Sequence, residues 1–280
     1  KFELEISMHI APFENDNKPL VDVDDSIVPL TYFNIVKLEI GQAFSYQTPG
    51  YETCVVPATG TVDVSIEGEN YSAIGQRTEN VWDGEPEGVY VPSGAKTEFV
   101  CTSEAAEIFV AGAKYDKVME PFAVRADDID MVQYGSDDTK THRKIKHILG
   151  TKYNDKVGRL LVSELFTVGA GGWSGFPSHK HDTERLPDET LHNEVYNFRF
   201  NPDHGFGMQL LQPDGDAVGE AFHLIDGSTF AFNAGYHPCV AAPGYEMYYF
   251  TILGGLNQRS LIQSFQPEHA YQVETIPGIK

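Results

Sequence analysis

The chain consists of many short apolar or alternating runs separated by turn sequences, and this rhythm constrains its fold more than any other feature. The runs at residues 33–40, 160–168 and 194–200 are typical of strands, whose side chains alternate between two faces. Turn pairs such as Pro49-Gly50 separate runs of this kind. No long stretch has a convincing helical period. The sequence therefore predicts an all-β protein built as a sandwich or barrel.

The two halves of the sequence look like divergent copies of each other. Residues 88–97 and 228–237 both read as a strand, a glycine-containing turn and a residue directed back inward. The second copy ends in His237, where the first copy has only Lys96-Thr97. The first half also has no His-x-His sequence, and Glu52 is its one obvious coordinating side chain near the corresponding strand. One half is therefore expected to bind metal and the other is not.

The joint between the copies is expected within residues 127–146, a polar and charged stretch typical of a linker or crossing strand. We expect residues 1–135 to form an N-terminal barrel without a metal motif and residues 136–280 to form a C-terminal barrel with a metal site. The joint contains the densest basic cluster of the chain, formed by Lys140, Arg143, Lys144 and Lys146. Such a run is usually a solvated face, but here it could offset the acidic background near a ligand.

The overall charge limits the possible partners. The chain has 41 acidic and 20 basic side chains, a formal net charge of −21, which repels nucleic acid and anionic membranes. Its three cysteines are far apart and lack a CxxC spacing, as is typical of buried thiols in a reducing cytoplasm. No run is apolar and long enough to span a bilayer, and the N-terminus has no signal-peptide pattern. We expect a cytoplasmic protein with a small-molecule partner and neither nucleic acid nor a membrane.

The segment around His179 and His181 carries the strongest chemical signal. Two histidines one residue apart on a strand lie on the same face, so both imidazoles can reach one point. Glu194 on the next strand can supply a carboxylate oxygen to that point, and His237 can supply a third nitrogen. Three nitrogens and one carboxylate are typical of a catalytic divalent-metal centre rather than a structural one. We expect one divalent ion, with Zn²⁺ first and Mn²⁺, Fe²⁺ or Ni²⁺ as alternatives.

Other polar side chains are candidates for acid–base chemistry and substrate binding. His192 shares a strand face with Glu194 and could act as a general base. Arg199 could bind a carboxylate in bidentate fashion. Lys180 is a weaker candidate, because it lies between the two histidines and should point the opposite way. Asp182 could orient a ligand imidazole. The remaining candidates offer an amide or hydroxyl group to a sugar: Gln209, Tyr236 and Tyr249.

Several motifs together resemble those of the 5-deoxy-glucuronate isomerase family of bacterial myo-inositol catabolism, with a more distant likeness to 5-keto-4-deoxyuronate isomerase. The resemblance covers nearly all of residues 30–270. The family pattern Trp-Ser-x-x-Pro-x-His-Lys-His-Asp corresponds to residues 173–182, and Glu-(Val/Thr)-Tyr corresponds to residues 194–196. The pattern Arg-x-Asn-Pro-x-x-Gly-Phe-Gly corresponds to residues 199–207, and the pattern that begins Gly-Tyr-His-Pro corresponds to residues 235–249.

The resemblance implies a bicupin, two β-sandwich or jelly-roll barrels in one chain, with the metal in the C-terminal barrel. It implies aldose–ketose isomerisation of a uronic-acid-type sugar, 5-deoxy-glucuronate to 2-deoxy-5-keto-gluconate, through an enediolate. The implied metal ligands are His179, His181, Glu194 and His237. We expect His192 and Tyr249 to be catalytic, and we expect the substrate to be bound by Arg199, Gln209, Tyr236 and Lys180. Family members often assemble, so a homo-oligomer is expected.

Two basic positions of the family are missing from this chain. A basic residue is usual where this chain has Ala234, and an arginine is common where it has Leu210. The substrate's carboxylate therefore lacks two of its expected partners, whereas the metal motif is intact. Two alternatives stay open: a redox cupin resembling an iron or manganese dioxygenase, because three histidines and a glutamate suit those metals equally well, and a non-catalytic sugar-binding cupin.

Overall fold

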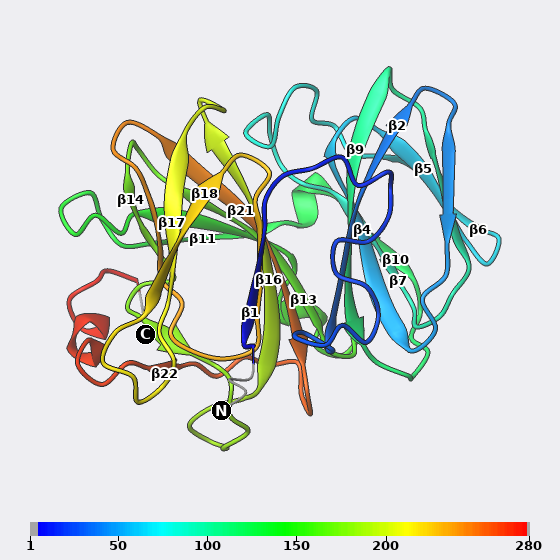
Figure 1. Cartoon of the computed structure of the whole chain (residues 1–280). Helices are drawn as coiled ribbons and strands as arrows, with labels where there is room; N and C mark the ends of the chain where they lie inside the picture. Colours follow the sequence, from blue (N-terminus) through cyan, green and yellow to red (C-terminus); the bar gives the residue numbers. More distant parts are fainter. Residues whose placement is uncertain (1–4, 279–280) are drawn as a thin grey trace.

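The computed structural model describes residues 5–278 and consists almost entirely of strands. Figure 1 shows two barrels side by side, the first half of the chain in blue to green and the second half in green to red. Short 3₁₀ turns lie at Ala126–Asp128, Thr151–Tyr153 and Ala270–Val273. No helix in the described range is long and apolar enough to cross a membrane. The expected all-β fold with two barrels is confirmed.

The first barrel is formed by two facing sheets. The larger sheet has the strand order β10 (Phe122–Val124), β7 (Gly88–Val91), β4 (Tyr51–Thr59), β9 (Ala105–Lys114) and β2 (Thr31–Glu39). The smaller sheet has the order β3 (Ala43–Tyr46), β8 (Thr97–Cys101), β5 (Val62–Ile66) and β6 (Glu69–Ile74). An apolar cluster that includes Val55, Val89 and Phe99 fills the space between them. This barrel holds no group of histidine, cysteine or carboxylate side chains spaced for a metal, within residues 5–278.

The second barrel has a larger principal sheet. Its strand order is β1 (Ser7–Ile10), β19 (Thr229–Phe232), β16 (His192–Asn201), β21 (Glu246–Gly255), β13 (Leu160–Thr167), β12 (Arg143–Leu149) and β11 (Asp130–Tyr134). The facing sheet has the order β14 (Gly172–Ser174), β20 (Cys239–Ala241), β17 (Phe206–Leu211) and β18 (Glu220–Ile225). A third pair, β15 (His179–Lys180) and β22 (Ser264–Phe265), lies at one end.

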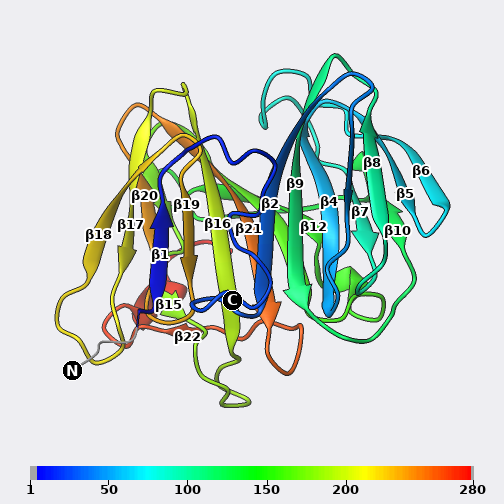
Figure 2. The same ribbon diagram turned by 45° about the vertical axis from the view of Figure 1, so that its right-hand side comes forward.

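Two strands from the first part of the sequence belong to the second barrel. Strand β1 pairs antiparallel with β19, and Figures 1 and 2 show it in dark blue against that barrel. Strand β11 pairs with β12. Both strands precede residue 136, where we expected the C-terminal barrel to begin, so the second barrel includes residues from both sides of that position.

A third core lies between the barrels, because their large sheets pack face to face. Side chains alternate along the central strands, so each strand contributes to two cores. Tyr196 and Phe198 of β16 face the interior of the second barrel, whereas Val195 faces the core between the barrels. Buried polar groups also cross this interface. The guanidinium of Arg77 donates to both carboxylate oxygens of Glu164, at 2.7 and 2.6 Å. These contacts join the two barrels into one packed body.

Candidate metal centre

Three buried imidazoles meet inside the second barrel. His179 lies in β15, His181 follows that strand, and His237 lies in the turn between β19 and β20. One nitrogen of each ring lies within 4.8 Å of the corresponding nitrogens of the other two rings. The histidines spaced one residue apart therefore reach the same point, as strand alternation requires, and the returning turn adds the third.

The hydrogen bonds of the three rings direct the same nitrogen toward the centre. In each imidazole, Nδ1 lies opposite a backbone carbonyl oxygen: Pro177 for His179 at 3.0 Å, His192 for His181 at 3.1 Å, and Gly235 for His237 at 2.9 Å. A carbonyl can only accept, so each Nδ1 carries the proton and donates it. In the neutral form of each ring, Nε2 is therefore the nitrogen that carries the lone pair, as in metal-binding histidines.

Glu194 places its carboxylate beside two of these nitrogens. Its Oε2 lies 3.0 Å from Nε2 of His181 and 3.6 Å from Nε2 of His237. Its Oε1 accepts a hydrogen bond of 2.7 Å from the hydroxyl of Thr251 on the neighbouring strand β21. The side chain is buried, so Thr251 fixes the orientation of a carboxylate that has little contact with water.

The electrostatics of the cluster suit a cation. Burial, with the neighbouring His181, lowers the pKa of His179 to about 3, and burial lowers the pKa of His237 well below its usual range. Burial also acts to lower the pKa of His181, but the hydrogen bond and charge of Glu194 outweigh it and raise that pKa. Within residues 5–278, Nε2 of His237 finds no hydrogen-bond partner despite its burial. The neutral imidazoles of His179 and His237, the ring of His181 and the carboxylate of Glu194 together form a donor set suited to a divalent metal.

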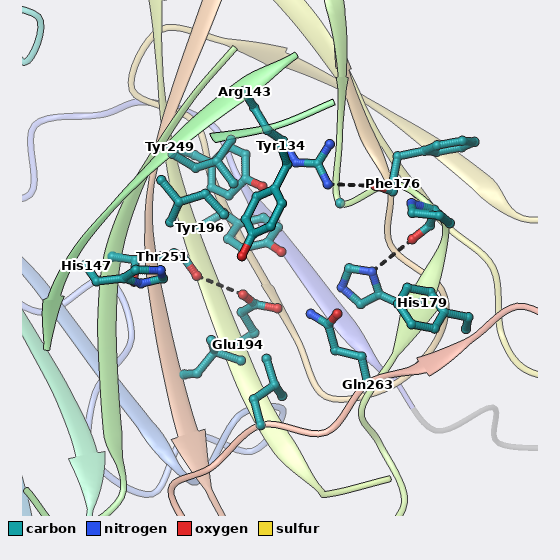
Figure 3. A pocket seen from close by; sticks show the side chains of 18 residues that line it. Tyr134, Arg143, His147, Phe176, His179, Glu194, Tyr196, Tyr249, Thr251 and Gln263 are labelled. Atoms are coloured by element: carbon teal, nitrogen blue, oxygen red, sulfur yellow. Dashed lines mark hydrogen bonds between the residues drawn. The ribbon is translucent and has the colours of Figure 1, made fainter. Parts of the chain in front are cut away.

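A cavity of about 350 Å³ opens onto this cluster. Its wall includes His179 and Glu194, and Figure 3 shows both side chains facing the same space as Tyr134, Gln263 and the other labelled residues. The lining is mixed, with apolar side chains from β12, β13 and β21 and polar groups between them. The cavity is large enough to hold a small ligand beside the imidazoles.

The two side chains expected to be catalytic lie in different places. Tyr249 lines the cavity and shares a hydrogen bond of 2.7 Å with the hydroxyl of Ser174. Burial raises its pKa well above the usual value, so the phenol stays neutral. His192 is not part of the cavity wall; its Nε2 lies 3.2 Å from the carbonyl of Arg259, and burial with His181 lowers its pKa to about 4.

Gln209 and Tyr236 lie behind the cluster rather than on the cavity. The amide nitrogen of Gln209 donates to the carbonyl oxygen of His237 at 2.7 Å, so Gln209 supports the turn that carries the third imidazole. The hydroxyl of Tyr236 lies 3.4 Å from a carboxylate oxygen of Asp214. Both residues are on strands or turns next to the site, but neither directs its polar group into the cavity.

Lys180 and Arg199 point away from the cavity because of strand alternation. Lys180 lies between the two histidines, and its ammonium group is held by Asp182 at 2.6 Å and by Glu189 at 3.0 Å. Asp182 also accepts the backbone N–H of Gly235 at 2.8 Å, which ties the His-x-His segment to the His237 turn instead of orienting an imidazole. Arg199 is an odd number of residues from Glu194 and extends toward the first barrel, where Glu107 binds it at 2.6 Å.

The cavity wall also contains residues that the motifs did not indicate. Arg143, Tyr134 and Gln263 line it, as does His147, whose Nδ1 lies 2.8 Å from the hydroxyl of Ser163. The sequence carried one signal for this group, the basic cluster at residues 140–146, which includes Arg143. It carried no interpretable spacing for His147, because that histidine reaches the cavity only through the pairing of β12 with β13.

The sequence is similar to a known family over nearly its whole length. The KduI/IolB family matches residues 8–272. The 5-deoxy-glucuronate isomerase of Geobacillus thermodenitrificans is 29% identical over 270 residues, 96% of each chain. The enzyme of the same name from Shouchella clausii is 32% identical over 237 residues, which are 84% of this chain and 85% of its own.

Solved structures confirm the architecture. An IolB-like protein from Salmonella typhimurium superposes with a TM-score of 0.85 at 23% identity, covering 95% of this chain and 98% of its own. Lactobacillus farciminis oxalate decarboxylase superposes with a TM-score of 0.62 at 7% identity, covering 96% and 92%. At these identities the structures support the bicupin fold alone. Together with the isomerase relatives, the match over residues 8–272 shows that this chain is an isomerase of the KduI/IolB family.

Proposed function

We propose that this protein is a metal-dependent aldose–ketose isomerase that acts on a uronic-acid-type sugar and converts 5-deoxy-glucuronate to 2-deoxy-5-keto-gluconate. One observation carries the metal dependence: three buried imidazoles, each with its Nδ1 proton bound by a backbone carbonyl, turn Nε2 toward one point beside Glu194. The choice of substrate is supported by relatives named 5-deoxy-glucuronate isomerase that align over most of the chain.

His179, His181, His237 and Glu194 would hold the ion. Zn²⁺ is our first candidate because it accepts imidazole nitrogen and carboxylate oxygen in catalytic sites, and Mn²⁺, Fe²⁺ and Ni²⁺ are the alternatives. When bound, a divalent ion supplies Lewis acidity that stabilises negative charge developing on sugar oxygens. Leu253, Leu165 and Phe265 line the same cavity and would limit the access of water to the reacting carbons.

The reaction moves a proton from the hydroxyl-bearing carbon to the neighbouring carbonyl carbon, through an enediolate of the sugar, while the hydroxyl proton passes to the former carbonyl oxygen. His147 is our candidate for the base, because it lines the cavity and burial lowers its pKa, which keeps the imidazole neutral. Its Nδ1 is anchored to Ser163, so the ring is held in one orientation. The neutral hydroxyl of Tyr249 can bind a sugar hydroxyl from the same wall. His192, our candidate from the sequence, lies outside the wall and does not enter this proposal.

Elemental analysis of the purified protein, combined with turnover of 5-deoxy-glucuronate under nitrogen, tests this function. We expect about one equivalent of divalent metal per chain, as four convergent ligands imply. His179→Ala should lose both the metal and turnover. His204→Ala is the matched control, because His204 is exposed on the surface and should retain both. Full turnover by metal-free His179→Ala would refute the site. Exchange of deuterium from heavy water into the product would support proton transfer over a hydride shift.

The same assay separates the two alternatives. A redox cupin would require oxygen, so turnover under nitrogen with Zn²⁺ in the site excludes it. A non-catalytic sugar-binding cupin would bind a uronate in a calorimeter without forming product. We also propose a cytoplasmic homo-oligomer, because members of the family often assemble; light scattering of the purified protein should then give a mass that is a multiple of the chain mass, 31.1 kDa.

A further inference from the structure

We propose that the guanidinium of Arg143 forms an anion-binding subsite of the cavity and binds the carboxylate of the sugar acid. This inference rests on the proposed function and deepens it, because it assigns the acidic end of the substrate to a residue. It also supplies a positive group that the sequence lacks at Leu210 and Ala234.

Arg143 reaches the cavity because β12 directs every second side chain into it. Arg143, Ile145 and His147 all line the cavity wall. The intervening Lys144 and Lys146 face the other way, and Lys146 pairs with Glu85 of the first half at 3.1 Å. The basic cluster in the sequence is therefore divided by strand alternation, and only one of its members on β12 belongs to the cavity.

The partners of Arg143 leave its charge uncompensated. The side chain is buried, and its Nη1 and Nη2 donate to the carbonyl oxygens of Thr141 at 2.9 Å and Phe176 at 2.7 Å. Neither acceptor carries a charge. Across residues 5–278, no carboxylate lies within 4.0 Å of its guanidinium, and no hydrogen bond occupies Nε. A buried cation without a counter-ion is costly, and an incoming carboxylate would offset that cost.

The other buried or half-buried arginines compared with Arg143 do not combine an unpaired charge with a place on the cavity wall. Arg77 is paired with Glu164 and Arg199 with Glu107. Arg259 also has no carboxylate partner in direct contact among the described residues, but its Nε, Nη1 and Nη2 all donate to oxygen atoms of the chain, and it does not line the cavity. Arg143 thus combines burial, an unpaired charge and a position on the cavity wall.

The arrangement of the cavity fits a sugar acid in particular. Figure 3 shows Arg143 beside Tyr134 and Phe176, while His179 and Glu194 line another part of the same space. Arg143 is the single arginine or lysine on the wall, as far as the chain is described. A uronic acid has its carbonyl at one end and its carboxylate at the other, so the two ends can meet the imidazole cluster and the guanidinium together. A planar guanidinium also matches a carboxylate in geometry.

Binding of D-glucuronate and of its uncharged amide, D-glucuronamide, to the Zn²⁺-loaded protein tests the subsite. The two ligands differ only at the group that we assign to Arg143. We expect the unmodified protein to bind the acid about 10- to 100-fold more tightly, as is usual for a charge-assisted pair in a shielded site. Arg143→Met should reduce that ratio to about one while the protein retains its metal. Lys144→Met is the matched control, because it removes the same charge from the opposite face of the same strand and should leave the ratio unchanged.

Arg143→Gln provides a second variant if the methionine variant does not fold, because an amide can still donate to the carbonyls of Thr141 or Phe176. Equal affinity of the unmodified protein for the two ligands, or an unchanged ratio in a folded, metal-loaded Arg143 variant, would overturn the assignment. A preference for the acid that depends on Arg143, without isomerisation of any sugar acid, would refute the proposed function and leave the subsite standing. Isomerisation of the sugar acid, combined with an unchanged affinity ratio in the Arg143 variant, would support the proposed function and overturn the subsite.

Discussion

Glu52 offers the sharpest test of how the two barrels are joined. This carboxylate is fully buried in β4 of the first barrel. It accepts the backbone N–H groups of Gly158 at 2.9 Å and Leu160 at 2.7 Å, at the start of β13 in the second barrel. It also accepts the N–H of Arg159 and the hydroxyl of Tyr90. Glu52→Gln keeps the shape of the side chain but replaces one accepting oxygen with an NH₂ group.

The size of the effect follows from these contacts. The glutamine side chain can keep the hydrogen bonds that one Glu52 oxygen accepts. It loses those accepted by the other oxygen, because an NH₂ group in that place would face N–H or O–H donors. A hydrogen bond to a charged group contributes about 1.5–3 kcal/mol. Two lost bonds, partly relieved by rearrangement, therefore give a destabilisation of about 3–5 kcal/mol, against a total stability of about 5–15 kcal/mol. The midpoint of thermal unfolding should fall by about 2–4 °C for each kcal/mol.

Urea unfolding followed by circular dichroism measures this loss, and elemental analysis is run on the same samples. Glu67→Gln is the matched control, because Glu67 also accepts a backbone N–H, that of Lys96 at 2.6 Å, but is exposed. It should change stability by less than about 0.5 kcal/mol. The metal content of Glu52→Gln should equal that of the unmodified protein. A stability loss below about 1 kcal/mol, or a loss of metal, would refute the role of Glu52 as a purely structural bridge.

Two further changes test the site itself. Thr251→Val removes the hydroxyl that fixes Glu194 and should weaken metal binding by about 10- to 100-fold, measured by competition with a chelator; unchanged affinity would show that Glu194 is held by other contacts. His147→Gln should lower kcat by about 10²- to 10⁴-fold with the metal retained. Because burial lowers the pKa of His147, this base stays neutral as pH falls below 6.5, so wild-type activity should decline only at lower pH; a decline centred at or above 6.5 would contradict its assignment.

The features that could be predicted from the sequence are those set by local alternation. Strand runs and turn pairs are local signals, so the all-β fold with two barrels could be predicted. His179 and His181 are one residue apart, so their common face follows from strand geometry alone, and both imidazoles do lie in one cluster with His237. The same reasoning indicated that Lys180 should point away from the cluster. Applied to Arg199, which lies an odd number of residues from Glu194, it would have separated that residue as well.

The remaining features depend on contacts between distant parts of the chain. Arg143 and His147 reach the cavity because β12 is added to the edge of β13, and no spacing in the sequence reports that pairing. Whether Arg143 has a carboxylate partner depends on every strand around it. Local reasoning could identify a basic cluster but could not divide it between a cavity and the barrel interface. For the same reason, the pairing of β1 with β19 could not be inferred from the residues that surround β1 in the sequence.

The comparison of Glu52 with Glu194 explains why the candidate metal ligands lie in one barrel and not in the other. Strands β4 and β16 occupy equivalent positions: Thr53 pairs with Val91 of β7, and Glu194 pairs with Phe232 of β19. The counterpart of Glu194 is therefore Thr53, whose hydroxyl lies 2.7 Å from that of Tyr46 inside the first barrel.

Glu52 is displaced by one residue from that register, so it faces the opposite side of the sheet and meets the second barrel. Its own counterpart is Asn193, whose side-chain oxygen accepts the N–H of Leu30 in the first half at 3.0 Å. The two equivalent positions thus both bridge the barrels. Asn193 accepts a backbone N–H at the start of β2, and Glu52 accepts one at the start of β13. A carboxylate on this strand can face either the interface or the barrel interior, and a shift of a single residue decides between a structural bridge and a candidate metal ligand.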